Sequence, residues 1–218
     1  MPAWGTHMTD EQSGGRELIE VHFHGPLPSH IANLRSLHDD FAFAMRCAQA
    51  YLSLGALNMD ETFRTTVAEG LWTSAVISYR RGFTKGKAHL QRGARRPQIP
   101  DSWFQRLDHE YQEAHKEILE IANQQVAHRA GKHEHIKVCA LLMPPPLPRA
   151  LYSSATVMVL RISPSDEQVK QLGTLCQDLI NGLLRQIESA TEELAAFVKA
   201  QNLDDLYEDP TRINRTEQ

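Results

Sequence analysis

The sequence has few of the features that mark several common classes of protein. It contains three cysteines, Cys47, Cys139 and Cys176, and no CxxC pair, which disfavours both a disulfide framework and a zinc ribbon. No apolar run approaches the ~20 residues that a helix needs to cross a bilayer. The N-terminal segment lacks the basic and apolar regions of a secretory signal. We therefore expect a cytoplasmic protein that does not enter a membrane.

The chain also lacks a strong excess of charge and the common phosphate-binding motifs. Its formal net charge is -4, with 41% hydrophobic and 23% charged residues, as is ordinary for a soluble globular protein. Nucleic-acid binding would therefore need a local basic patch. Neither a GxxxxGK[ST] loop nor a GxSxG elbow is present. No cofactor and no metal site are predicted.

What the sequence does have is a helical periodicity. Apolar residues recur every three or four positions, which is typical of helices with one face in a core. The predicted helices span 29–55, 60–79, 101–127 and 164–201. Asp60 and Asp101 are the expected N-caps of the second and third helices. Ser163, with Pro164 at the first helical position and Asp166 three residues on, is the expected cap of the last one.

Three short segments have the pattern of strands, near 17–23, 136–142 and 155–162. The last two are short apolar runs and are expected to be buried. The fold class is therefore mainly α, a four- or five-helix bundle with a small β element. Residues 16–207 are expected to form one domain. It would follow a disordered segment at 1–15, in which either Met1 or Met8 is the start, and precede a polar tail at 208–218.

The third predicted helix carries a family resemblance. Its segment DHEYQEAHKEILEIANQQVAHR (108–129) resembles the signature helix of the HEPN superfamily, small helical bundles that often cut RNA as toxins or defence proteins. It is most similar to a group of uncharacterised bacterial HEPN-like proteins, and WTSAVISYRRGF (72–83) resembles the preceding helix of that group. The positions that match on the signature helix are His115, Ile118, Asn123, Val126, Ala127 and His128. The resemblance implies a HEPN-like bundle that dimerises.

The nuclease motif of that superfamily is an arginine, a polar residue and, after four to six residues, a histidine. Asn123 and His128 fit the last two positions, but Ala122 stands where the arginine belongs. The resemblance implies that His128 would act in acid–base chemistry, for which imidazole is suited near neutral pH. The phosphate would then need a guanidinium from elsewhere, and Arg80 or Arg81 is the candidate. The alternative for His128 is an ordinary helix-end residue, favoured there by the helix dipole.

A basic segment follows the second predicted helix. Residues 80–100 include seven lysines or arginines and no acidic residue, a composition that attracts polyanions in a salt-dependent way. The alternative is a solvated loop whose charges answer acidic faces of the chain or of a partner. The candidate polyanion-binding residues are Arg80, Arg81, Lys85, Lys87, Arg92, Arg95 and Arg96.

Three functions follow as hypotheses. The first is a non-catalytic HEPN-like bundle, a homodimer that binds a partner protein or a nucleotide or RNA. The second is a metal-independent ribonuclease of the toxin or defence type, with His128 as acid–base group, Asn123 beside it and an arginine supplied from elsewhere. The third is a structural dimerisation module built on the last helix.

Overall fold

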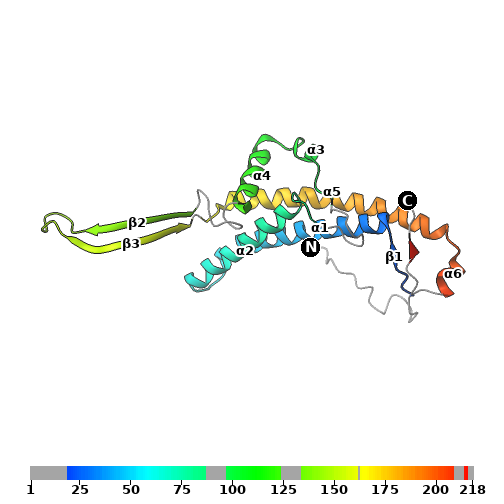
Figure 1. The fold of residues 1–218 in the computed structure, drawn as a ribbon, viewed down its shortest axis with the longest axis horizontal. Helices are drawn as coiled ribbons and strands as arrows, with labels where there is room; N and C mark the ends of the chain where they lie inside the picture. The colour runs from blue at the N-terminus through cyan, green and yellow to red at the C-terminus, as the bar shows by residue number, and fades with distance from the viewer. Residues whose placement is uncertain (1–18, 87–96, 124–133, 162, 209–213, 216–218) are drawn as a thin grey trace.

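The computed structural model describes residues 19–86, 97–123, 134–161, 163–208 and 214–215. In this part of the chain the fold is mainly α-helical with a small β component (Figure 1). The main helices of the body are α1 (Pro26–Ser53), α2 (Glu61–Arg81), α4 (His109–Ile121) and α5 (Asp166–Lys199). This confirms the predicted helical bundle with a small β element.

The core lies where these four helices meet. The two longest, α1 and α5, run side by side, while α2 packs against α1 and α4 packs against both α5 and α2 (Figure 1). Each contributes the apolar stripe that its three- and four-residue spacing predicted. Fully buried side chains at the centre include Leu37, Phe41, Val76, Tyr79, Val169, Leu172 and Cys176. The bundle is thus held together by one continuous apolar core.

The predicted N-caps are confirmed in one place and wrong in another. The Asp60 side chain accepts a hydrogen bond of 3.1 Å from the Phe63 amide at the start of α2. The last helix begins two residues later than expected, with Ser165 rather than Ser163 as its cap. Ser165 and Gln168 each accept a hydrogen bond from the other's backbone amide, at 3.2 and 2.9 Å. This reciprocal capping box satisfies two amides that would otherwise lack partners.

Substitution of Ser165 by alanine should therefore lower the free energy of unfolding by about 1 kcal/mol. The variant loses the acceptor for the Gln168 amide, a bond that a methyl group cannot replace. Urea denaturation at matched protein concentration measures the change. Ser163→Ala is the matched control, because Ser163 is exposed and precedes the cap, and it should change stability by less than ~0.5 kcal/mol. Equal effects of the two substitutions would contradict this capping assignment.

The predicted helix over 101–127 is divided in the structure. A single turn, α3 (Asp101–Phe104), precedes a break, and α4 then begins after Asp108. Asp101 is therefore the first residue of α3 and not its cap, which is Pro100. The break has a packing reason: the Trp103 indole is buried and donates a 2.7 Å hydrogen bond to Asp178 of α5. The end predicted near Ala127 lies outside the described residues.

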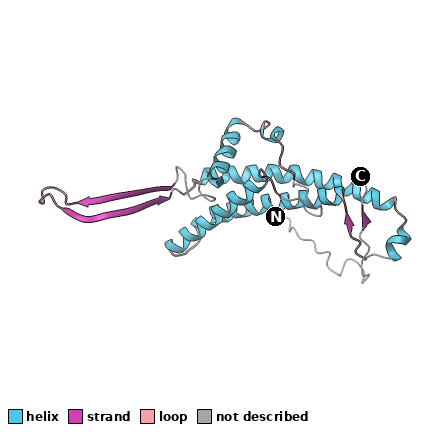
Figure 2. Cartoon of the chain, viewed as in Figure 1, coloured by secondary structure: helices cyan, strands magenta, loops and turns pink. Residues whose placement is uncertain are grey.

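The two long strands form an antiparallel hairpin, β2 (Glu134–Leu142) with β3 (Leu151–Arg161). The hairpin projects away from the helices (Figure 2). The prediction that these strands are buried is wrong for the side chains that the structure describes, since Val138 and Leu142 are 68% and 71% exposed. An apolar run predicts a strand but does not say which surface covers it.

The third predicted strand is shorter than expected. Of residues 19–23, the described part of that range, only Phe23 belongs to β1 (Phe23–His24), which pairs in parallel with β4 (Asn214–Arg215). Gly25 then adopts φ 133°, a conformation that glycine takes readily, and Pro26 opens α1. At the other end, α6 (Leu203–Glu208) follows α5, and α1 is followed by the short turn η1 (Leu54–Ala56). The predicted disordered segment at 1–15 lies outside the described residues.

Candidate functional site

The side chain of His115 is surrounded by aromatic rings on the buried side of α4. It is only 8% exposed. Its ring centroid lies 4.5 Å from that of Phe83 and 4.8 Å from that of Phe104, with Tyr79 and Trp103 at 5.8 and 6.0 Å. These rings come from α2, the segment after it, and α3. His115 therefore packs α4 against the end of α2, the segment that follows it, and α3.

His115 and its hydrogen-bond partner Tyr79 are both uncharged at neutral pH. The Tyr79 hydroxyl lies 2.8 Å from His115 Nδ1, and Tyr79 is completely buried. Burial lowers the pKa of His115 to about 4, with a smaller contribution from Lys116, and it raises the pKa of Tyr79 well above its usual value. Both groups are therefore neutral at neutral pH.

The same bond selects one tautomer. Within the described residues, His115 is the only hydrogen-bond partner of the Tyr79 hydroxyl. A buried hydroxyl proton without an acceptor costs about 1–3 kcal/mol. The hydroxyl therefore donates to Nδ1, and the proton of the neutral imidazole is on Nε2.

A cleft of about 530 Å³ opens beside His115. Phe83, Phe104, Ile99 and Leu119 supply apolar walls, and the polar side chains at its edge include Lys116 and Asn123. The Lys116 ammonium is held by Glu113 at 2.7 Å and lies 5.9 Å above the Phe104 ring. The cleft thus combines an aromatic interior with a polar edge, as ligand sites commonly do.

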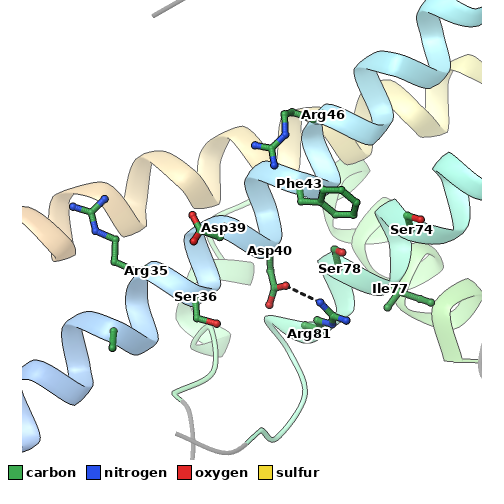
Figure 3. A pocket seen from close by; sticks show the side chains of 11 residues that line it. Arg35, Ser36, Asp39, Asp40, Phe43, Arg46, Ser74, Ile77, Ser78 and Arg81 are labelled. Atoms are coloured by element: carbon green, nitrogen blue, oxygen red, sulfur yellow. Dashed lines mark hydrogen bonds and ion pairs between the residues drawn. The ribbon is translucent and has the colours of Figure 1, made fainter. Parts of the chain in front are cut away.

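A second, larger groove of about 930 Å³ lies between α1 and α2 (Figure 3). Along α1 its lining includes Asp39, Phe43 and Arg46, which follow one another at four- and three-residue spacing, and Asp40 beside them. Phe43 is 43% exposed at its centre, and the Arg46 guanidinium lies 5.9 Å from the Phe43 ring. Arg81 of α2 closes one part of the groove through a 3.1 Å ion pair with Asp40. The groove is therefore mixed in charge with an apolar centre.

The predicted site residues are not gathered at one place in the described part of the chain. Asn123 lines the cleft, whereas Arg81 lies in the α1–α2 groove. Arg80 is half-buried, and its Nε has no hydrogen-bond partner among the described residues. Lys85 is exposed. The other predicted site residues lie outside the described residues, namely Lys87, Arg92, Arg95, Arg96 and His128.

Ala122, where the HEPN-like motif has its arginine, has a packing role. It is 1% exposed and belongs to the core beside Ile118 and Ile121. The helix therefore presents this position to the apolar interior. An arginine here would bring a charge into the core, where it is costly without a partner.

The buried thiols offer no reactive group. Cys47 and Cys176 lie in the core, as their place on apolar stripes predicts, and burial raises the pKa of both. A thiol with a raised pKa is a poor nucleophile because the reactive form is the thiolate.

The groove residues and the His115–Tyr79 pair were missed as site residues by sequence reasoning. The groove had a readable signal, since Asp39, Phe43 and Arg46 share one solvent face of a predicted helix. The pair had none, because Tyr79 and His115 are 36 residues apart and only the fold brings them together.

Comparisons with family models, with curated proteins and with solved structures gave no match. Within the described ranges, no cluster of three or more His, Cys, Asp or Glu side chains is placed to hold a metal ion. The helices seen in those ranges include none with the length and apolarity needed to cross a membrane.

Proposed function

We propose that this protein is a non-catalytic, homodimeric binding module of the HEPN-like type, which holds a partner protein or RNA rather than cutting RNA. The observation that carries the proposal is the self-complementary stripe on the open face of α1, formed by Asp39, Phe43 and Arg46. Elsewhere in the protein, the His115 side chain is neutral, which agrees with a binding role.

The order of charges along the stripe suits a two-fold axis near Phe43. With a rise of ~1.5 Å per residue, Arg46 lies ~4.5 Å beyond Phe43 along the helix and Asp39 lies ~6 Å before it. When two copies of α1 cross in antiparallel directions at Phe43, Arg46 of each copy comes level with Asp39 of the other. The same patch then faces itself, as an isologous interface requires.

The groups on this stripe are also available for such contacts. Arg46 forms no ion pair with a described residue, and the Asp39 side chain is 79% exposed, while its Oδ1 lies 3.2 Å from Nδ1 of the neighbouring His38. Asp40 by contrast is 13% exposed and held by Arg81, so it shapes the groove from within the subunit. Exposed ion pairs contribute only ~0.2–1 kcal/mol each, so we expect a weak dimer with a Kd on the order of micromolar.

Charge reversal tests this dimer. Arg46→Glu places a carboxylate opposite Asp39 of the second copy and should weaken association about tenfold or more. The double variant Arg46→Glu, Asp39→Arg restores opposite charges across the axis and should recover association. Sedimentation velocity over concentrations around the expected Kd measures both.

The matched control is Arg185→Glu on an exposed position of α5, which should leave association unchanged. A native protein that stays monomeric throughout the concentration range would rule the dimer out. A dimer that Arg46→Glu leaves intact would place the interface on another surface.

The alternative activity, RNA cleavage, has its own test. Native protein and His128→Ala are incubated with total RNA in EDTA, and the products are resolved on a denaturing gel. We expect no cleavage by either protein. Cleavage by the native chain that is lost in His128→Ala would replace the binding module by the ribonuclease, with an arginine such as Arg80 as its cation.

A further inference from the structure

We propose that the cleft beside His115 is a binding site for a neutral, planar aromatic ring that carries a carbonyl acceptor, as in an aromatic carboxamide or lactam. This goes beyond the dimeric module proposed above and does not depend on it, because the cleft and the α1–α2 groove share no lining residue.

The donor for the carbonyl is His115 Nε2–H. Tyr79 holds Nδ1 at 2.8 Å and thereby assigns the ring proton to Nε2. No described residue accepts a hydrogen bond from Nε2, although His115 is 92% buried (8% exposed) and lines the cleft. Nε2 is not among the fully buried unpaired atoms of the described residues, so it opens to the cleft, where a ligand or a water accepts its hydrogen bond.

The aromatic walls of the cleft favour the binding of a flat ring. The ring centroids of Phe83 and Phe104 lie 4.5 and 4.8 Å from that of His115. Both side chains are half-buried and line the cleft, so both present ring surface to it. Leu119 and Ile99 complete an apolar surround. An aromatic ligand would gain stacking or edge contacts of roughly 0.5–1.5 kcal/mol per ring pair beyond the burial of its surface. The volume of about 530 Å³ falls within the range of small-molecule sites.

The charges around the cleft select a neutral ligand. Asp101 and Glu120 lie at its edge, and Lys116, the cation there, is already paired with Glu113 at 2.7 Å. A carboxylate or phosphate would therefore meet the Asp101 carboxylate, against a cation that Glu113 already neutralises. The neutral His115 adds no positive charge. A neutral acceptor such as an amide carbonyl meets none of this repulsion.

Three probes of similar size separate the features of the ligand. Benzamide has the flat ring and the neutral carbonyl, benzoate has the ring with a negative charge, and cyclohexanecarboxamide has the carbonyl without the ring. Each is titrated into the full chain labelled with ¹⁵N-histidine, and the His115 ring nitrogens are followed by NMR. The free protein should show the Nε2–H tautomer at neutral pH.

We expect benzamide to shift the His115 signals with a Kd on the order of millimolar, as befits a fragment. Benzoate and cyclohexanecarboxamide should each bind at least about fivefold more weakly. Tyr79→Phe removes the hydroxyl that fixes the tautomer and leaves the cleft wall unchanged. It should weaken benzamide binding about threefold to tenfold. Phe104→Leu should weaken it by a similar factor while leaving the tautomer unchanged.

Equal binding of all three probes, or no His115 shift with benzamide at its solubility limit, would overturn the proposal. A free protein with its proton on Nδ1 would do so too. Repeating the titration in Phe43→Ser separates this site from the dimer, since that variant should lose association and keep benzamide binding.

Discussion

Replacement of Gly82 by alanine should destabilise the fold by about 2 kcal/mol, although the residue has an ordinary helical conformation, with φ -66°. The cause is space: a Cβ at Gly82 would overlap the Phe41 ring. That ring is completely buried and lies between Tyr79 and Phe83, at 5.8 and 6.0 Å between centroids. It has no room to retreat, and overpacking a filled core typically costs 1–3 kcal/mol.

Gly70→Ala is the matched control for this substitution. Gly70 lies within α2, the helix that Gly82 caps, and a Cβ there would meet no atom within 4 Å. Alanine should therefore stabilise α2 by about 0.5–1 kcal/mol through its higher helix propensity. Thermal or urea unfolding of the two variants should move in opposite directions. Equal stabilisation by both would show that Phe41 yields to the added methyl group.

The contrast between these glycines illustrates what the sequence can and cannot predict. The apolar spacing of α1, α2 and α5 is enough to place Phe41, Tyr79 and Leu172 in a core, because a helix buries one face at a fixed period. The closeness of Gly82 to Phe41 depends on how α1 and α2 pack. Periodicity along one helix does not contain that information.

The corrected features have the same origin. Ser163 and Ser165 both stand close to Pro164 and are equally good caps by composition, and only the hydrogen bonds with Gln168 distinguish them. The 101–127 pattern reads as one helix, but the Trp103–Asp178 contact is made across to α5 and accompanies a break. Burial of the hairpin strands was inferred from an apolar run without knowing what would cover it.

For the candidate site, the resemblance drew attention to His128, which lies outside the described residues, rather than to His115. It assigned chemistry to His128 and treated His115 as a matched position without a role. The structure gives His115 four aromatic neighbours and a buried phenol as partner. Those contacts, made across 36 residues of sequence, turn an unremarkable helix residue into the polar centre of the cleft.

Acidification should destabilise the protein through His115 by about 2 kcal/mol between pH 6.5 and pH 4. Its pKa is about 4 in the folded protein against an ordinary value of 6.5. Above pH 6.5 the imidazole is neutral in both states and adds no pH dependence. Between pH 6.5 and pH 4 the unfolded chain binds a proton that the folded chain does not bind. The free energy of unfolding therefore falls as the pH is lowered to 4 and then becomes constant.

The size of this destabilisation follows from the two pKa values of His115, about 4 in the folded protein and 6.5 ordinarily. The full difference corresponds to about 3 kcal/mol, and water at the cleft edge of the ring should reduce this to about 2 kcal/mol. Tyr79, which faces His115, does not replace it as the source, because its raised pKa keeps the phenol neutral over this range. Lys116, Asp101 and Glu120 line the cleft in the native and the variant protein alike, so their contributions cancel in the difference.

His115→Phe provides the measurement. The variant leaves the Tyr79 hydroxyl without its acceptor, which lowers stability by a constant amount at every pH below the titration of the phenol. Its free energy of unfolding should therefore lie below that of the native protein at pH 7 and approach it as the pH falls to 4. His30→Gln, at an exposed position of α1, should keep the native profile. Parallel curves for the native protein and His115→Phe would mean that His115 titrates normally in the folded chain, and that burial does not hold it neutral.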